Sequence, residues 1–237
     1  TLSSRAYIDI TLDVMKSFGV YVKNDNYSSF TIQGNQKYTL QSYTVEGDFS
    51  QAAFWLVAGA LGCDVTCSGL DEKSLQSDKK IIEIIESTGA TVERISKNSL
   101  KARHSANMKG ITIDADDIPD LVPILAVLLC FCKVKSRIEN AGRLRIKESD
   151  RLAAITAELK KMGADIFEGA DYLEIEGKQV LNGAEVSSWN DHRSSMAPAL
   201  AACRCEGEVT IDGAKKSVKK SYPNFFEDYK ALGGEIE

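Results

Sequence analysis

The sequence lacks several features that define large classes of protein. Its 237 residues include only 4 prolines and 17 glycines, too few for a collagen-like, disordered or linker-dominated chain. The longest apolar run, residues 121–132, is much shorter than the roughly 20 residues of a membrane-spanning helix. Apolar residues make up 43 % and charged residues 27 %, as in ordinary globular proteins. We expect a globular protein with no membrane partner and enough residues for one large domain or two small ones.

The sequence also lacks an excess of basic residues and the histidine and cysteine patterns typical of metal sites. The 29 Lys and Arg residues against 34 Asp and Glu give a net charge of −5, so a nucleic-acid partner is not expected. The only histidines are His104 and His192, and no C-x₂-C pair occurs, so we expect neither a metal nor another cofactor. The six cysteines are interpreted as small, buried, reduced thiols. The first residues carry no secretory pattern, and we expect a cytoplasmic protein.

Glycine recurs at a regular spacing along the chain. Gly19, Gly89, Gly163 and Gly233 follow one another at intervals of 70, 74 and 70 residues. Each follows a helix-like stretch, where a left-handed residue commonly ends a helix. Strand-like runs with a two-residue period come after them, as in residues 91–95 and 172–175. This spacing predicts an internal repeat.

A second series has the same period. Asp48, Asp117 and Asp191 each precede an apolar stretch, at residues 52–62, 121–132 and 196–202, and a β-rich run follows each stretch. A helix that is apolar on all sides must be buried. The predicted fold class is therefore α/β (α+β), an inside-out α/β barrel of repeated β-α-β-α-β-β units with helices buried and sheets outside.

The repeat also predicts a domain boundary near residues 43–46. Three units would make up residues 45–237, and residues 1–44 would be the last part of a preceding unit and domain. On this interpretation the chain continues upstream of Thr1.

Polar clusters interrupt the apolar pattern at a few places. Residues 143–151 carry four cations ahead of a helix that Ser149 or Asp150 can cap, and a helix N-terminus suits an anion. Composition alone favours a solvated charged loop. Residues 189–193 enter a second helix with Asp191 as a plausible N-cap, but capping does not explain Arg193 at the start of a buried helix. Residues 215–223 are a third, lysine-rich cluster, for which a basic surface turn is the simplest interpretation.

A fourth cluster, residues 116–120, consists largely of carboxylates beside the most apolar helix. Asp120 lies deepest, so we expect burial to raise its pKa, as a general base requires. If the repeat is real, these clusters converge at one end of the domain. Arginines and lysines beside carboxylates, without metal ligands, suit a substrate that bears phosphate and carboxylate groups.

Several strings within these clusters resemble one enzyme family. Residues 45–48 (VEGD), 118–120 (IPD), 145–152 (RIKESDRL), 190–193 (NDHR) and 220–223 (KSYP) resemble segments of EPSP synthase (3-phosphoshikimate 1-carboxyvinyltransferase), in that family's order and with compatible spacing. Residues 4–9 resemble its contact segment for shikimate 3-phosphate. The resemblance runs along the whole chain.

The resemblance implies a transferase of the shikimate pathway, which leads to chorismate and the aromatic amino acids. The 5-hydroxyl of shikimate 3-phosphate would attack phosphoenolpyruvate, and phosphate would leave. The family has two domains of three units each, and its N-terminal half is absent from this chain. We therefore expect the partner to be that missing half of the same polypeptide, the chain alone to be inactive, and the full-length enzyme to be monomeric.

The resemblance also implies roles residue by residue. Asp120 would take the hydroxyl proton, and Glu148 would exchange a proton at the methylene carbon. Phosphoenolpyruvate would be bound by Arg151, Arg193 and Lys220, and shikimate 3-phosphate by Ser4, Arg5, Asp120 and Lys147. His192 would orient its loop. Arg143 stands where some members have a substrate-binding asparagine, so its role is left open.

Two alternative hypotheses concern the activity of the chain. The UDP-N-acetylglucosamine enolpyruvyl transferases have a similar fold and chemistry, but they do not share the K-E-S-D-R and N-D-H-R strings in this form. The isolated chain could also be a non-catalytic anion-binding fragment. Release of phosphate from the two substrates distinguishes these hypotheses.

Overall fold

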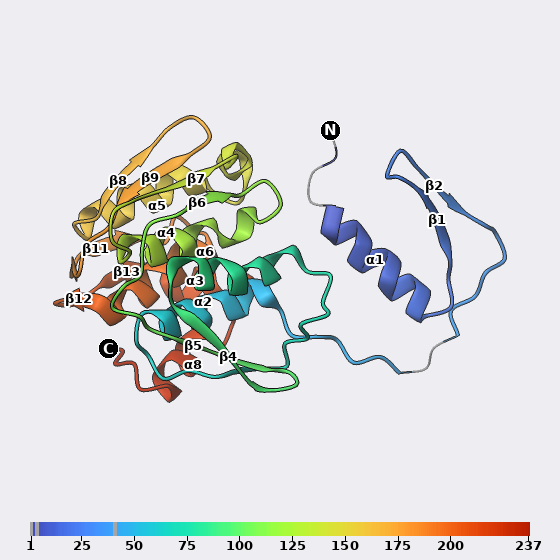
Figure 1. The fold of residues 1–237 in the computed structure, drawn as a ribbon, viewed down its shortest axis with the longest axis horizontal. Coiled ribbons are helices and arrows are strands. Elements are labelled where there is room, and N and C mark those ends of the chain that lie inside the picture. Colours follow the sequence, from blue (N-terminus) through green and yellow to red (C-terminus); the bar gives the residue numbers. More distant parts are fainter. Residues whose placement is uncertain (1, 3–4, 40–41) are drawn as a thin grey trace.

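The computed structural model describes residues 2, 5–39 and 42–237. Figure 1 shows most of the chain gathered into one body, with α1 and the β1–β2 hairpin set apart from it. The helices are α1 (Arg5–Ser17), α2 (Phe49–Ala60), α3 (Ile81–Thr88), α4 (Val122–Cys130), α5 (Arg151–Lys161), α6 (His192–Ala201), α7 (Ala214–Ser217) and α8 (Phe225–Ala231). The strands are β1 (Val22–Asp25), β2 (Ser29–Ile32), β3 (Cys67–Ser68), β4 (Thr91–Ser96), β5 (Ser99–Arg103), β6 (Thr112–Asp114), β7 (Lys135–Glu139), β8 (Asp165–Glu168), β9 (Leu173–Glu176), β10 (Leu181–Asn182), β11 (Glu185–Ser187), β12 (Cys205–Glu206) and β13 (Thr210–Asp212).

Three helices form the centre of the main body. All residues of α4 and α6 are buried, and Gln51 is the only residue of α2 that is not. The three helices pack against one another, because none of them has a polar face to leave in water. The expectation of buried central helices is therefore confirmed. Within the described residues, no helix is long and apolar enough to cross a membrane.

The sheets lie around these helices and confirm a mixed α/β fold. Strands β6 and β7 pair in parallel, and α4 lies between them in the chain. Strands β11 and β13 also pair in parallel, and α6 lies between them in the chain. Antiparallel hairpins β4–β5 and β8–β9 follow α3 and α5. The order β6, α4, β7, α5, β8, β9 is one complete unit of the predicted β-α-β-α-β-β type. The expected closed barrel is not found, because every sheet of the described residues is open, with orders such as β6-β7-β9-β8 and β3-β5-β4.

The repeated glycines end their helices as predicted. Gly19, Gly89, Gly163 and Gly233 have φ angles of 82°, 97°, 83° and 95°, which non-glycine residues seldom adopt. The β-rich runs expected after the three apolar stretches begin at residues 64, 133 and 208. The strands β3, β7 and β13 begin two or three residues later, at Cys67, Lys135 and Thr210.

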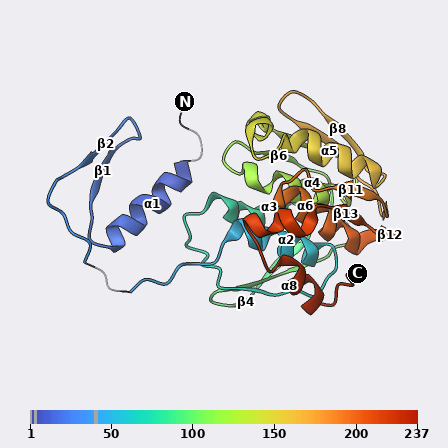
Figure 2. The ribbon, with the colours of Figure 1, turned by 180° about the vertical axis from the view of Figure 1, so that it is seen from behind.

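The N-terminal part is a helix with a hairpin. Figures 1 and 2 show α1, β1 and β2 beside the main body, and residues 42–48 lead into α2 without regular secondary structure. No residue of α1 is buried. The Tyr27 hydroxyl donates a 2.6 Å hydrogen bond to Asp9 Oδ1, which attaches the hairpin to the helix.

The six cysteines are free thiols. Cys67, Cys130 and Cys132 are buried, Cys63 and Cys205 are half-buried, and Cys203 is exposed. The expectation of six buried thiols is therefore wrong for Cys203, because the turn after α6 carries it to the surface.

Candidate active site

The candidate site lies where the N-terminal ends of α2, α5 and α6 meet the turn before α4. Asp48, Asp150 and Asp191 cap the three helices and accept hydrogen bonds from Ser50 N, Ala153 N and Arg193 N at 2.8, 3.0 and 2.8 Å. Helix N-termini carry partial positive charge and unpaired N–H groups. Their convergence makes this end of the molecule suitable for anions.

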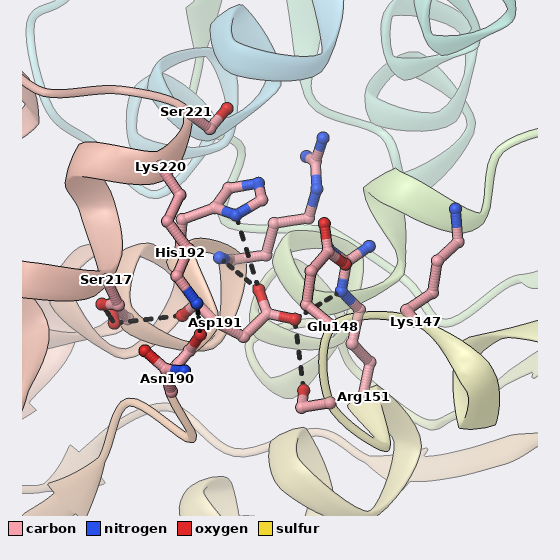
Figure 3. Close-up of polar contacts among 12 residues, drawn as sticks. Lys147, Glu148, Arg151, Asn190, Asp191, His192, Ser217, Lys220 and Ser221 are labelled. Carbon is pink, nitrogen blue, oxygen red and sulfur yellow. Dashed lines mark hydrogen bonds and ion pairs between the residues drawn. The ribbon is translucent and has the colours of Figure 1, made fainter.

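Arg151, the first residue of α5, joins three carboxylates. Its Nη1 donates to Asp120 Oδ1 at 2.7 Å, its Nη2 to Glu148 Oε2 at 2.5 Å and its Nε to Asp191 Oδ2 at 2.8 Å. The Arg151 side chain is 1 % exposed. In Figure 3, His192 and Lys220 lie on one side of Asp191, and Glu148, Arg151 and Lys147 lie on the other. Buried charges of this kind persist only when they are paired and hydrogen-bonded.

Asp120 is surrounded by positive charge. Its carboxylate lies 3.4 Å from Lys147 Nζ and 3.3 Å from Arg193 Nη2, in addition to its contact with Arg151. Burial alone would raise the pKa of Asp120, but the charges of Arg193, Arg151 and Lys147 together lower it to about 2. The prediction of a raised pKa for Asp120 is therefore wrong. It considered burial of the carboxylate and not the three cations that the fold brings to it.

Arg193 continues the network toward α2. Its Nη1 donates to Asp120 O at 3.1 Å and its Nη2 to Ser50 Oγ at 2.7 Å. Ser50 is also hydrogen-bonded to Asp78, a buried carboxylate whose pKa burial raises to about 6. Arg193 Nε is buried without a hydrogen-bond partner among the described residues. Sequence reasoning missed Ser50 and Asp78, which belong to no recognised motif.

The segment 190–193 connects the network to Lys220. Lys220 Nζ donates to the carbonyl oxygen of Asn190, directly before Asp191. Asp191 is fully buried and also accepts a 3.1 Å hydrogen bond from Ser149 Oγ. Burial and the neighbouring Arg193 lower the pKa of His192, which favours the neutral imidazole.

The predicted site residues of the N-terminal segment are not all brought together. Ser4 lies outside the described residues. Arg5 is exposed, and its guanidinium carbon lies 5.2 Å from the centre of the Tyr27 ring. Tyr7, from the same segment, reaches the cluster instead, because its hydroxyl lies 3.4 Å from Asp120 Oδ2. Sequence reasoning singled out the segment but not Tyr7 as its contact residue.

The exposure of the side chains indicates what a ligand could reach. Glu148 is 45 % exposed, Lys147 28 % and Asp120 17 %. Glu148 and Asp120 are therefore carboxylates that a ligand can reach, and both lie beside cations. Such carboxylates can take a proton from an anionic substrate or give a proton to it. No cluster of residues suited to hold a metal ion occurs in the part of the chain that the structure describes.

Comparison with known sequences identifies similar proteins. The sequence profile described as EPSP synthase (3-phosphoshikimate 1-carboxyvinyltransferase) matches residues 1–229. A 3-phosphoshikimate 1-carboxyvinyltransferase of Clostridium acetobutylicum is 50 % identical over 235 residues, which are 99 % of this chain and 54 % of that protein. The enzyme of the same name from Clostridium kluyveri is 49 % identical over 236 residues, 100 % of this chain and 55 % of that protein. The chain thus spans about half the length of these curated relatives.

The fold of the chain is also similar to those of solved structures. An EPSP synthase from Acinetobacter baumannii has a TM-score of 0.82 and 30 % identity, covering 94 % of this chain and 54 % of that one. The enolpyruvyl transferase NikO from Streptomyces tendae has a TM-score of 0.79 and covers 100 % of this chain and 54 % of that one. Its identity of 18 % indicates similarity of fold alone.

Proposed function

Since the chain belongs to the EPSP synthase (3-phosphoshikimate 1-carboxyvinyltransferase) family, we propose that it supplies part of an active site for enolpyruvyl transfer. The reaction joins the enolpyruvyl group of phosphoenolpyruvate to the 5-hydroxyl of shikimate 3-phosphate and releases phosphate. The observation that carries this proposal is the Asp120 carboxylate, held between Arg151, Arg193 and Lys147 where helix N-termini converge.

Asp120 is proposed as the base. With a pKa of about 2 it is ionised but weakly basic while its three cations are unengaged by substrate. Anionic groups of the substrates would draw on the same cations, and the pKa of Asp120 would then rise toward that of an effective base. The cations therefore suppress the basicity of Asp120 until the substrates are bound.

Glu148 is proposed as the acid that acts at carbon. The substrate oxygen bonds to C2 of phosphoenolpyruvate as Asp120 takes the hydroxyl proton, and the carboxyl group of Glu148 gives a proton to the methylene carbon. Phosphate then leaves C2 and takes the proton from Asp120, while Glu148 takes a proton back from the methyl group, which restores the double bond. The exposed position of Glu148 supports this role.

The binding roles form the next part of the proposal. Arg151, Arg193 and Lys220 would hold phosphoenolpyruvate, and the unpartnered Nε of Arg193 is a donor suited to its anionic groups. Shikimate 3-phosphate would be held by Ser4, Arg5, Asp120 and Lys147. Arg151 donates three of its five N–H groups to carboxylates, and its side chain is 1 % exposed, so binding through it requires a neighbouring side chain to move.

The proposal includes a domain organisation. Residues 1–44 are proposed as the last part of one domain and residues 45–237 as a second domain of three repeat units. The relatives are about twice as long as this chain, so we propose that the remainder of the polypeptide completes the site. A cytoplasmic location and a monomeric full-length enzyme belong to the same proposal.

Product formation tests the proposed function. The full-length polypeptide should form 5-enolpyruvylshikimate 3-phosphate and an equal amount of phosphate from the two substrates, whereas residues 1–237 alone should form essentially none. No product from the full-length polypeptide would contradict the proposed reaction and favour an anion-binding role. Turnover by residues 1–237 would show that this chain is sufficient.

A further inference from the structure

A strained turn lies directly before the site residues on α6. Trp189 and Asn190 are consecutive non-glycine residues with φ angles of 50° and 53°. A left-handed conformation is uncommon for any non-glycine residue and more so for a bulky one. It persists where the surrounding structure holds it, and such strain gathers at functional positions. The contacts of this turn therefore need an explanation.

Glu158 holds this turn from the facing helix. It lies on α5 and is 2 % exposed. Its Oε1 accepts a 2.7 Å hydrogen bond from Trp189 Nε1, and its Oε2 accepts a 2.9 Å hydrogen bond from Ser187 N. Lys161 Nζ, at 2.7 Å from Oε2, completes its partners. Burial alone would raise the pKa of Glu158, but the contacts with Lys161, Trp189 and Ser187 N outweigh it and lower the pKa, so the carboxylate is ionised.

The Trp189 indole N–H donates to this buried carboxylate. The residue is 39 % exposed, which is unusual for a side chain whose role is to fill a core. A partly exposed tryptophan whose N–H donates to a buried carboxylate can hold its own backbone in place. We call the Glu158–Trp189 hydrogen bond the tether, because it connects the 189–190 turn to α5.

The turn leads directly into the candidate site. The carbonyl oxygen of Asn190 accepts from Lys220 Nζ. The next residue, Asp191, caps α6 and accepts from Arg151 Nε at 2.8 Å. Arg193 follows two residues later, as the second residue of α6. A change in the turn would therefore move the cations at 193 and 220 together, and it would also alter the partner of Arg151.

We propose that Glu158, through Trp189, is a positioning residue that fixes the 189–190 turn and thereby aligns Arg193 and Lys220 for the phosphoenolpyruvate anion. This inference rests on the proposed function. Misplacement by about 1 Å far from the reacting atoms can cost on the order of 100-fold in rate. An effect of about 10- to 100-fold is therefore expected from loss of the tether.

Kinetics of the full-length polypeptide test the inference. Glu158→Gln and Trp189→Phe should each raise KM for phosphoenolpyruvate and lower kcat/KM about 10-fold or more, with KM for shikimate 3-phosphate unchanged. The double variant should be no worse than the more impaired single variant, because both changes break one connection. Lys161→Ala is the matched control: it removes a partner of Glu158 without touching the turn and should leave both KM values unchanged.

A second readout does not depend on activity. Exchange of the Trp189 indole N–H with solvent, followed by NMR, should be slow in the wild type and fast in Glu158→Gln. Trp189→Phe keeps the buried carboxylate, so it remains informative if Glu158→Gln fails to fold. Wild-type kinetics in both variants, or unchanged indole exchange, would overturn the inference. An inactive wild type would refute the proposed function instead, and the exchange experiment would still decide whether Glu158 holds the turn.

Discussion

In urea unfolding at pH 7, Arg151→Met is expected to lower the free energy of unfolding by about 3–5 kcal/mol. The Arg151 side chain is 1 % exposed, and its guanidinium group bridges Asp120, Glu148 and Asp191. Without it, three carboxylates face one another with much of their compensating charge removed. Methionine fills most of the volume, so the loss reports charge rather than a cavity.

The loss of unfolding free energy in Arg151→Met should depend on pH. Asp120 has a folded-state pKa of about 2, below its unfolded value of about 3.9. Its contribution to stability is therefore fully present above about pH 4 and lost as the pH falls toward 2. The difference in unfolding free energy between wild type and Arg151→Met should be largest at neutral pH and should decrease as the pH falls from about 4 toward 2.

A matched surface variant controls for loss of an arginine. Arg94 pairs with Glu72 at 2.8 Å, but its side chain is 54 % exposed. Arg94→Met should change stability little, because water and salt screen exposed ion pairs. Equal effects of Arg94→Met and Arg151→Met would contradict a special role for the buried network.

Arg193→Ala is expected to lower kcat/KM for phosphoenolpyruvate by about 100-fold or more in the full-length polypeptide. Arg193 contributes a planar fork to the proposed anion site and also contacts Asp120 and Ser50. Removal of one partner of a buried charge pair costs about 2–5 kcal/mol. Steady-state kinetics with varied phosphoenolpyruvate measure this loss.

Arg193→Lys separates charge from geometry. Lysine keeps the positive charge but cannot donate two parallel hydrogen bonds, so its kcat/KM should fall between those of wild type and Arg193→Ala. Circular dichroism should show both variants folded. Turnover near the wild-type value with unchanged dependence on phosphoenolpyruvate in Arg193→Ala would count against the assignment.

Local patterns predicted much of the fold. The glycine spacing located four left-handed helix ends, and the absence of a polar face predicted burial of α2, α4 and α6. Closure into a barrel was not predictable from these patterns, because it depends on which strand edges find partners. The edges of the β6-β7-β9-β8 sheet remain open in the described residues.

The sequence predicted several members of the candidate site but not its electrostatics. The clusters at 118–120, 145–152 and 190–193 do converge, and Asp120, Lys147, Glu148, Arg151 and Arg193 form one network. The sequence predicted a raised pKa for Asp120, whereas three cations from other segments outweigh burial and lower that pKa. Asp78 and Glu158 were missed because each acts through a long-range contact and carries no local motif.

The most direct test of the central claim is a crystal structure of the full-length polypeptide with shikimate 3-phosphate and an unreactive analogue of phosphoenolpyruvate. We predict anionic oxygens of the analogue within about 3 Å of Arg193 and Arg151 nitrogens. We also predict the 5-hydroxyl within about 3 Å of the Asp120 carboxylate. Both ligands bound away from these three side chains would contradict the account.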